Sequence, residues 1–198
     1  MQKGTKAALG EGARIRAFRN REAWQNWLDK NHRSSAGTWI RLAKKGSENP
    51  SVTYPEALEV ALCYGWIDAQ KRAESESAWL QRFMPRKPRS IWSKINREKA
   101  LALIESGKMK PAGLEEVDRA KKDGRWESAY DSPKAATVDP DFQKALSKNP
   151  RAKAFFEAVN ATNRYAILWR IQTAKKPETR AKRIRAFIEM LEKGETIH

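Results

Sequence analysis

The eight tryptophans of this 198-residue chain are distributed very unevenly. Seven of them precede residue 130, and the eighth is Trp169. Because large aromatic side chains dominate the cores that contain them, the two parts of the chain must build different cores. We therefore expect a flexible N-terminus over residues 1–13, a first domain over 14–127 and a second over 139–198. Residues 128–138, rich in Ser, Pro and Ala without hydrophobic periodicity, are the predicted linker.

The first part mixes helix and strand signals. Thr53 followed by Glu56 is a capping-box pattern, which predicts a helix that ends at Gly65. Asn20 is expected to cap an earlier helix and Ser90 a later one that runs to residue 106. Alternating or aromatic-rich segments predict strands at 14–18, 38–45, 66–72 and 79–84, of which the last two pair antiparallel, and a further helix is expected over 111–123.

The second part carries only helix signals. Asp139 and Asn149 each place a capping residue before a proline at the first helical position, and two more helices are expected to begin at Asn160 and Pro177. Their apolar faces can only be hidden against one another. The predicted fold class is therefore α+β: a small mixed or antiparallel sheet with helices, followed by a C-terminal bundle of four short helices.

The charge and the metal-ligand inventory exclude several classes of protein. The chain has 40 Lys and Arg against 24 Asp and Glu, for a net charge of +16. One cysteine and two histidines allow neither an internal disulfide nor a tetrahedral Cys/His zinc site, so no metal is expected. There is no GxSxG, HExxH, P-loop or GxGxxG pattern, and no cofactor is expected. There is no apolar run of about 18 residues for membrane insertion. The first 20 residues lack the apolar core of an export signal, which predicts a cytoplasmic location.

Arginines alternate with aromatic rings between residues 66 and 97. Guanidinium groups pair with phosphate or carboxylate, and a neighbouring ring can stack on a base or a cation, so this mixture predicts a site for an anionic ligand. Free N–H groups of a helix capped by Ser90 would add to it. The alternative is that the aromatics form the core and the arginines a solvated rim. The candidate residues are Trp66, Asp68, Lys71, Arg82, Phe83, Arg86, Arg89, Ser90, Trp92, Ser93, Asn96 and Arg97.

Two residues in or near this segment have chemically reactive side chains. Asp68 could act as a general base, but an aspartate among arginines is more often a salt-bridge anchor that orients them. Cys63 lies on an apolar helix face without a neighbouring histidine in the sequence, which favours core packing over nucleophilic catalysis. No catalytic residue is predicted.

A second basic cluster opens the last helix. Cations at the positive end of a helix dipole are locally unfavourable, which suggests that another group recruits them, although a solvated bundle surface is the simpler interpretation. The members of this candidate patch are Lys175, Lys176, Arg180, Lys182 and Arg183.

Several long segments resemble the bacterial YdeI/OmpD-associated family, also called bacteriocin-protection proteins. They are SVTYPEALEVALCYGWIDAQ (51–70), WLQRFMPRKPRSIWSKINRE (79–98), GKMKPAGLEEV (107–117), NRYAILWRIQTAKKPETRAKRI (163–184) and FIEMLEKGETIH (187–198), and the resemblance extends over residues 15–198. It implies a mixed first part, a helical final domain, a role in resisting bacteriocins or cationic antimicrobial peptides, and an outer-membrane partner. It implies no known reaction.

Three functions from different classes follow. The favoured one is a non-enzymatic basic module of bacteriocin or stress resistance that binds an anionic ligand or acidic partner through residues 66–97. The second is a nucleic-acid-binding protein, supported by the charge and the aromatic rings. The third is an enzyme that acts on a small anionic substrate near Trp66, Asp68 and Arg82. The oligomeric state is not predicted.

Overall fold

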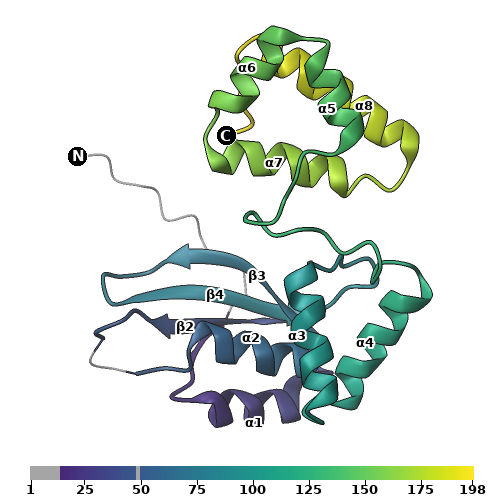
Figure 1. Ribbon diagram of the computed structural model, residues 1–198. Coiled ribbons are helices and arrows are strands. Elements are labelled where there is room, and N and C mark those ends of the chain that lie inside the picture. Colours follow the sequence, from purple (N-terminus) through teal and green to yellow (C-terminus); the bar gives the residue numbers. More distant parts are fainter. Residues whose placement is uncertain (1–13, 48–49) are drawn as a thin grey trace. The chain divides into compact units, whose positions relative to one another are not determined.

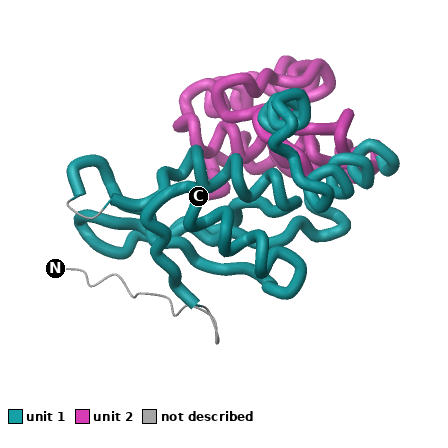
Figure 2. Tube along the Cα trace, turned by 90° about the horizontal axis from the view of Figure 1, so that it is seen from below, with its two compact units in different colours: residues 1–90, 98–123 teal, residues 91–97, 124–198 magenta. Residues whose placement is uncertain are grey.

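The structure is a computed structural model that describes residues 14–47 and 50–198. The predicted flexible N-terminus, residues 1–13, lies outside the described residues. The chain divides into two compact units, coloured separately in Figure 2: residues 1–90 and 98–123 form the first, and residues 91–97 and 124–198 the second. Residues 128–138, the predicted linker, contain no helix and no strand longer than a single bridge, and they belong to the second unit.

A four-stranded mixed sheet forms the centre of the first unit (Figure 1). Its strands are β1 (Ile15–Ala17), β2 (Thr38–Ala43), β3 (Trp66–Ala73) and β4 (Ala78–Pro85), in the spatial order β1-β2-β4-β3. The β1–β2 pair is parallel, and the β2–β4 and β3–β4 pairs are antiparallel. The predicted small mixed sheet and its β3–β4 hairpin are confirmed.

Helices α1 (Arg21–Asn31) and α2 (Tyr54–Cys63) lie against one face of this sheet (Figure 1). Both begin at the predicted caps: the Asn20 side chain accepts a hydrogen bond from the Ala23 amide at 3.0 Å, and Thr53 and Glu56 form the capping box. Trp24 of α1 is fully buried, and its ring contacts the rings of Trp66 and Phe83. Trp24 and Trp66 therefore help to hold α1 on the sheet.

Helix α3 (Lys94–Glu105) begins three residues later than predicted, and α4 (Pro111–Lys122) follows it. Ser90 does not cap α3, because its hydroxyl accepts a hydrogen bond from the Lys87 amide at 2.9 Å within a turn. The cap is Ser93, which accepts from the Asn96 amide at 3.2 Å. The prediction of a Ser90 cap was wrong because the chain before Lys94 pairs with Tyr130, a contact that is distant in sequence.

The second unit contains the four predicted short helices, α5 (Pro140–Ser147), α6 (Pro150–Ala158), α7 (Ala161–Gln172) and α8 (Pro177–Glu192). Their shared core holds Phe142, Leu146, Ala152, Phe156, Ile167, Leu168, Ile171, Ile184 and Leu191. All of these residues lie between 139 and 198. Together with the sheet of the first unit, these helices confirm the α+β fold class.

We predict that a fragment of residues 139–198 folds alone, because every buried member of this core belongs to it. The fragment should give a helical circular dichroism spectrum with a cooperative thermal transition. A fragment of residues 14–90, which lacks α3 and α4, is the comparison and should be less ordered. A random-coil spectrum for residues 139–198 would contradict the prediction.

Candidate functional site

The predicted basic segment begins in the β3–β4 hairpin, where alternate residues point to opposite faces of the sheet. Asp68 is the Cα partner of Phe83, and Lys71 is the partner of Gln81, so these side chains lie on the face that α1 and α2 cover. Arg82 lies on the opposite face. The sheet therefore separates residues that adjoin one another in the sequence.

Three arginines from three adjacent strands meet on this opposite face. Leu80 of β4 is the Cα partner of both Arg41 on β2 and Arg72 on β3, and Arg82 is the partner of Trp39. Neighbouring strands are spaced by about 5 Å, so all three side chains share one small area. We call the surface formed by Arg41, Arg72 and Arg82 the arginine face.

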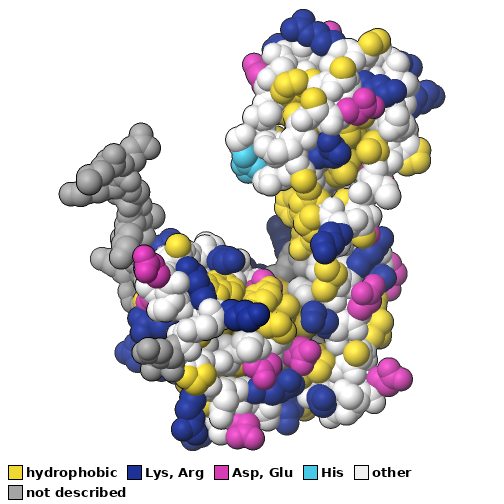
Figure 3. All heavy atoms as spheres, turned by 60° about the vertical axis from the view of Figure 1, so that its left-hand side comes forward, with side chains coloured by type: hydrophobic (Ala, Val, Ile, Leu, Met, Phe, Trp, Pro, Cys, Tyr) yellow, Lys and Arg dark blue, Asp and Glu magenta, His cyan; other side chains and the backbone are white. Residues whose placement is uncertain are grey.

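An apolar pair lies beneath these arginines. Trp39 and Leu80 are buried, and the Arg72 guanidinium lies over the Trp39 ring, 5.2 Å from its centroid. A guanidinium in this position is attracted by the electrons of the ring, which helps to fix its orientation. Figure 3 shows basic side chains bordering areas of hydrophobic side chains on the side of the molecule that it presents. The buried Trp39 ring thus holds the Arg72 guanidinium in a defined position.

Glu74 is an acidic neighbour of this face. Glu74 accepts three hydrogen bonds from Arg41, two from Nε at 3.0 and 2.7 Å and one from Nη2 at 2.6 Å. This hydrogen bonding, aided by the charge of Glu74, raises the pKa of Arg41. Arg82 contacts only the Gln70 amide oxygen, at 3.4 Å, and has no ion-pair partner among the residues that the structure describes. Arg82 is therefore the member best able to receive an anionic group.

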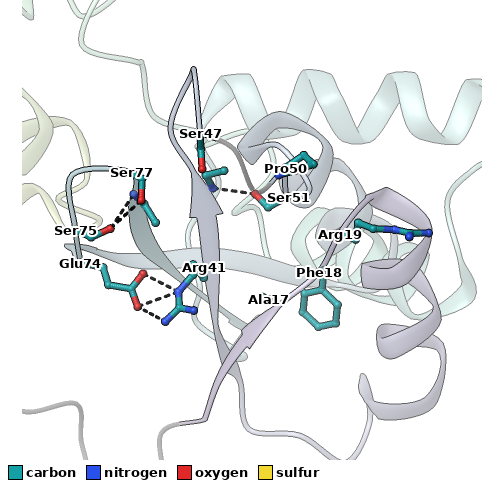
Figure 4. Close-up of a pocket in the computed structure, with 12 residues that line it drawn as sticks. Ala17, Phe18, Arg19, Arg41, Ser47, Pro50, Ser51, Glu74, Ser75 and Ser77 are labelled. Atoms are coloured by element: carbon teal, nitrogen blue, oxygen red, sulfur yellow. Dashed lines mark hydrogen bonds and ion pairs between the residues drawn. The ribbon is translucent and has the colours of Figure 1, made fainter.

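A groove of about 640 Å³ adjoins the arginine face (Figure 4). Its wall includes the Arg41–Glu74 pair and Arg19. Its serines are engaged locally: Ser51 Oγ accepts from the Ala43 amide at 2.8 Å and Ser75 Oγ from the Ala78 amide at 3.1 Å. Hydroxyls held in this way are suited to hydrogen bonding with a ligand. The groove lining comprises Ala17, Phe18, Arg19, Arg41, Ala43, Ser47, Pro50, Ser51, Glu74, Ser75, Ser77 and Ala78.

All three aromatic members of the predicted site are internal. Trp66, Phe83 and Trp92 are each at most 2% exposed. Arg86 is 5% exposed, whereas Arg89 and Lys71 are exposed, and the Lys71 ammonium lies 4.4 Å from the centroid of the Trp79 ring. Of the predicted residues, Arg82 alone belongs to the arginine face. Arg41 and Arg72 were missed, although each is a cation in a predicted strand, because only the strand register shows that they are neighbours.

Asp68 does not orient any arginine. Its Oδ2 accepts a hydrogen bond from the Tyr54 hydroxyl at 2.9 Å, and it makes no ion pair within the described part of the chain. The predicted salt-bridge anchor was wrong because β3 directs Asp68 toward the start of α2, away from the arginine face.

The remaining predicted residues belong to the second unit. There, Trp92 meets the Trp126 ring edge-on at 4.9 Å between centroids. Arg97 Nη1 donates to the Trp126 carbonyl at 3.2 Å, and Lys94 Nζ lies 2.6 Å from an Asp131 carboxylate oxygen. The Ser93 hydroxyl caps α3 by accepting from the Asn96 amide. These contacts hold the start of α3 within the second unit, which is a structural role.

Cys63 packs in the core as predicted, and burial raises the pKa of its thiol. A thiol of this kind is a poor nucleophile at neutral pH. Within residues 14–47 and 50–198, no group of three or more His, Cys, Asp and Glu side chains is arranged to hold a metal ion. None of the helices in the same ranges is long and apolar enough to cross a membrane.

The second basic patch has a structural explanation for two of its members. Arg180 lies 2.6 Å from Asp141 and 3.1 Å from Asp139, and it donates to the Ile171 carbonyl at the end of α7. Hydrogen bonding to Asp141 is the main reason that the pKa of Arg180 is raised. Arg183 donates to a second carbonyl near that end, that of Arg170. The carbonyls at the C-terminus of α7 thus explain why Arg180 and Arg183 lie near the start of α8. Lys175, Lys176 and Lys182 are exposed.

The fold and this site define an α+β protein with an arginine-bearing sheet and a helical second unit. Residues 16–116 match a family described as Domain of unknown function (DUF8412), and because the match covers just over half of the chain, the chain belongs to this family. Residues 135–194 match the family described as Bacteriocin-protection, YdeI or OmpD-Associated. Comparisons with curated proteins and with solved structures found no match.

The second match confirms the family resemblance of the C-terminal part, and it connects this part with bacteriocin protection at the level of the family. The resemblance drawn from the sequence is broader, since it starts at residue 15. The residues that carry the sheet, α1 and α2 match the other family. The arginine face lies wholly in that first stretch.

Proposed function

We propose that the protein is a non-enzymatic binding module with a role associated with bacteriocin protection, and that its arginine face binds an acidic region of another protein. The observation that carries the proposal is the convergence of Arg41, Arg72 and Arg82 around the buried Trp39–Leu80 pair, with Arg82 in no ion pair among the described residues. Rigidly held arginines can pair bidentately with carboxylates.

The net charge of +16 decides the kind of partner. A strongly basic protein repels cationic peptides at long range, so direct capture of a cationic bacteriocin is unfavourable. Protection would therefore operate through an acidic partner or a regulated target. Surface lysines are of less importance for affinity, because scattered charges speed the encounter of two proteins more than they strengthen the complex.

The first test uses fluorescently labelled poly-L-glutamate as the acidic polypeptide. We expect Arg41→Ala and Arg82→Ala each to weaken binding about fivefold, the equivalent of about 1 kcal/mol for one partly exposed ionic contact. The matched control is Lys144→Ala/Lys148→Ala, which removes two exposed charges from the second unit. An equal loss of affinity in the control and in the arginine variants would show that net charge alone causes binding, and would refute the site.

Nucleic acid is the alternative outcome of the same titrations. Trp39, Phe83 and Trp92 are buried and so are not available to stack on bases. We expect binding of DNA or RNA to be weak, to disappear at about 150 mM salt, and to show no preference for single strands. Sub-micromolar, salt-resistant binding that Arg82→Ala abolishes would instead make nucleic acid the partner.

The proposed location is the cytoplasm. Fractionation of cells that express the full chain tests this, with recovery of the protein in the periplasm as the contrary result.

A further inference from the structure

A second basic concavity, separate from the arginine face, lies in the first unit between α1, α2 and the loop that joins α3 to α4. Its volume is about 440 Å³. Arg21 and Gln25 of α1, Cys63 and Tyr64 from the end of α2, and Lys108 and Lys110 of the loop line it. It shares no lining residue with the groove beside the arginine face, so it is an independent candidate site.

Three of these lining residues are cations, and one of the three is in an ion pair. Arg21 pairs with Glu59 at 3.0 Å. Lys108 and Lys110 form neither an ion pair nor a side-chain hydrogen bond with any residue in the described ranges. The other nearby acid, Asp29, accepts a hydrogen bond from the Tyr64 hydroxyl at 2.5 Å. The pocket therefore has an excess of positive charge.

The loop that carries the two lysines is held in place by its backbone. The amides of Lys108 and Met109 both donate to the Leu103 carbonyl, at 2.9 and 3.1 Å, and the Lys110 amide donates to the Cys63 carbonyl at 3.1 Å. Gly113 permits this approach, because a Cβ there would lie 2.4 Å from the Cys63 carbonyl oxygen. A ligand would meet lysines on a backbone that is already ordered, which lowers the entropic cost of binding.

The side chains of Lys108 and Lys110 are not needed to cap the C-terminus of α2. The Ala61 and Leu62 carbonyls accept from the amides of Tyr64 and Gly65, and the Cys63 carbonyl accepts from the Lys110 amide. The final carbonyls of α2 are thus satisfied by backbone groups. Burial raises the pKa of the Cys63 thiol, and the charges of Arg21, Lys108 and Lys110 oppose this rise, whereas that of Glu59 adds to it. The ammonium groups remain available for a ligand.

We propose that this pocket binds a small phosphate monoester, with its phosphate between Lys108, Lys110 and Arg21. Lysine ammonium groups are common phosphate ligands. The volume exceeds that of a phosphate ion several times and falls in the range of pockets that hold small organic molecules. Val60 and the Cys63 side chain supply apolar wall for the organic part of the ester.

The test titrates the full chain with phenyl phosphate, a monoester with an apolar body, and with inorganic phosphate at matched ionic strength. We expect saturable binding of phenyl phosphate, at least about tenfold tighter than that of inorganic phosphate. The Lys108→Ala/Lys110→Ala variant should weaken it by about tenfold or more, as the loss of two ionic contacts implies. The control Lys144→Ala/Lys148→Ala, which removes the same charge elsewhere, should bind as the wild type does.

Cys63 provides a second measurement, because it is the single cysteine of the chain and lines the pocket. Bound phenyl phosphate should slow alkylation of its thiol in the wild type and leave the rate unchanged in Lys108→Ala/Lys110→Ala. Equal affinity of this variant and the wild type, or an unchanged alkylation rate at saturation, would overturn the proposal. Equal affinity for phenyl phosphate and inorganic phosphate would overturn the monoester as the ligand class.

Discussion

Replacing Trp24 with alanine is expected to lower the free energy of unfolding of the first unit by about 3–5 kcal/mol. Trp24 is fully buried. Its ring lies 5.0 Å from that of Phe18 and 5.7 Å from that of Phe83, and its indole N–H donates to the Ala57 carbonyl at 3.0 Å. The alanine variant loses contacts with the sheet and α2 together and removes the hydrogen bond to the Ala57 carbonyl.

Hydrogen exchange followed by mass spectrometry measures this effect separately for each segment. Peptides from β2, β4 and α2 should lose protection in Trp24→Ala. Because globular domains are stable by only about 5–15 kcal/mol, the loss amounts to a large part of the total. The control is Trp79→Ala, a tryptophan in the same sheet that is only partly buried. A loss of protection no larger than in this control would disprove the central role of Trp24.

A comparable loss, about 3–5 kcal/mol, is expected for Phe142→Ala in the second unit. The Phe142 side chain is fully buried, and its ring meets that of Phe156 edge-on at 5.3 Å between centroids. The core that it joins consists of short helices, none of which would be stable alone in water. Removal of the ring should therefore reduce the helical circular dichroism signal at temperatures where the wild type remains folded.

Phe155→Ala is the matched control for this substitution, since the neighbouring phenylalanine is only partly buried against the same core. It should cost clearly less than Phe142→Ala. Hydrogen exchange should show the loss of protection in α5 to α8. Equal stability of Phe142→Ala and the wild type would mean that the helices do not depend on this core.

The elements that were predicted correctly carry their signals within a few residues. The Thr53–Glu56 box and the Asn149–Pro150 pair fix helix starts through contacts three residues apart. The start of α3 was misplaced because Ser90 and Ser93 are equally good caps in sequence. The choice between them depends on pairing of Ser93 with Tyr130, which no local pattern reveals.

The candidate site was only partly predictable for the same reason. A run of basic residues identified Arg82, but the strand register brings Arg41 and Arg72 to it from distant positions. Arg86 follows Arg82 in sequence and is buried nevertheless. In the last helix, the roles of Arg180 depend on Asp139 and Asp141, which lie about forty positions away.

The close approach of Gly113 to Cys63 predicts which residues should be conserved among relatives of this chain. Any side chain at position 113 would put a carbon atom within 2.4 Å of a backbone oxygen of α2, and backbone cannot rotate aside as a side chain can. Relatives that keep this approach of α4 to α2 should therefore retain glycine there over evolutionary time, whatever ligand they bind. Strict conservation of glycine at position 113 would indicate a constraint from the spacing of α2 and α4. Variation at Lys108 and Lys110 would instead indicate a change of ligand.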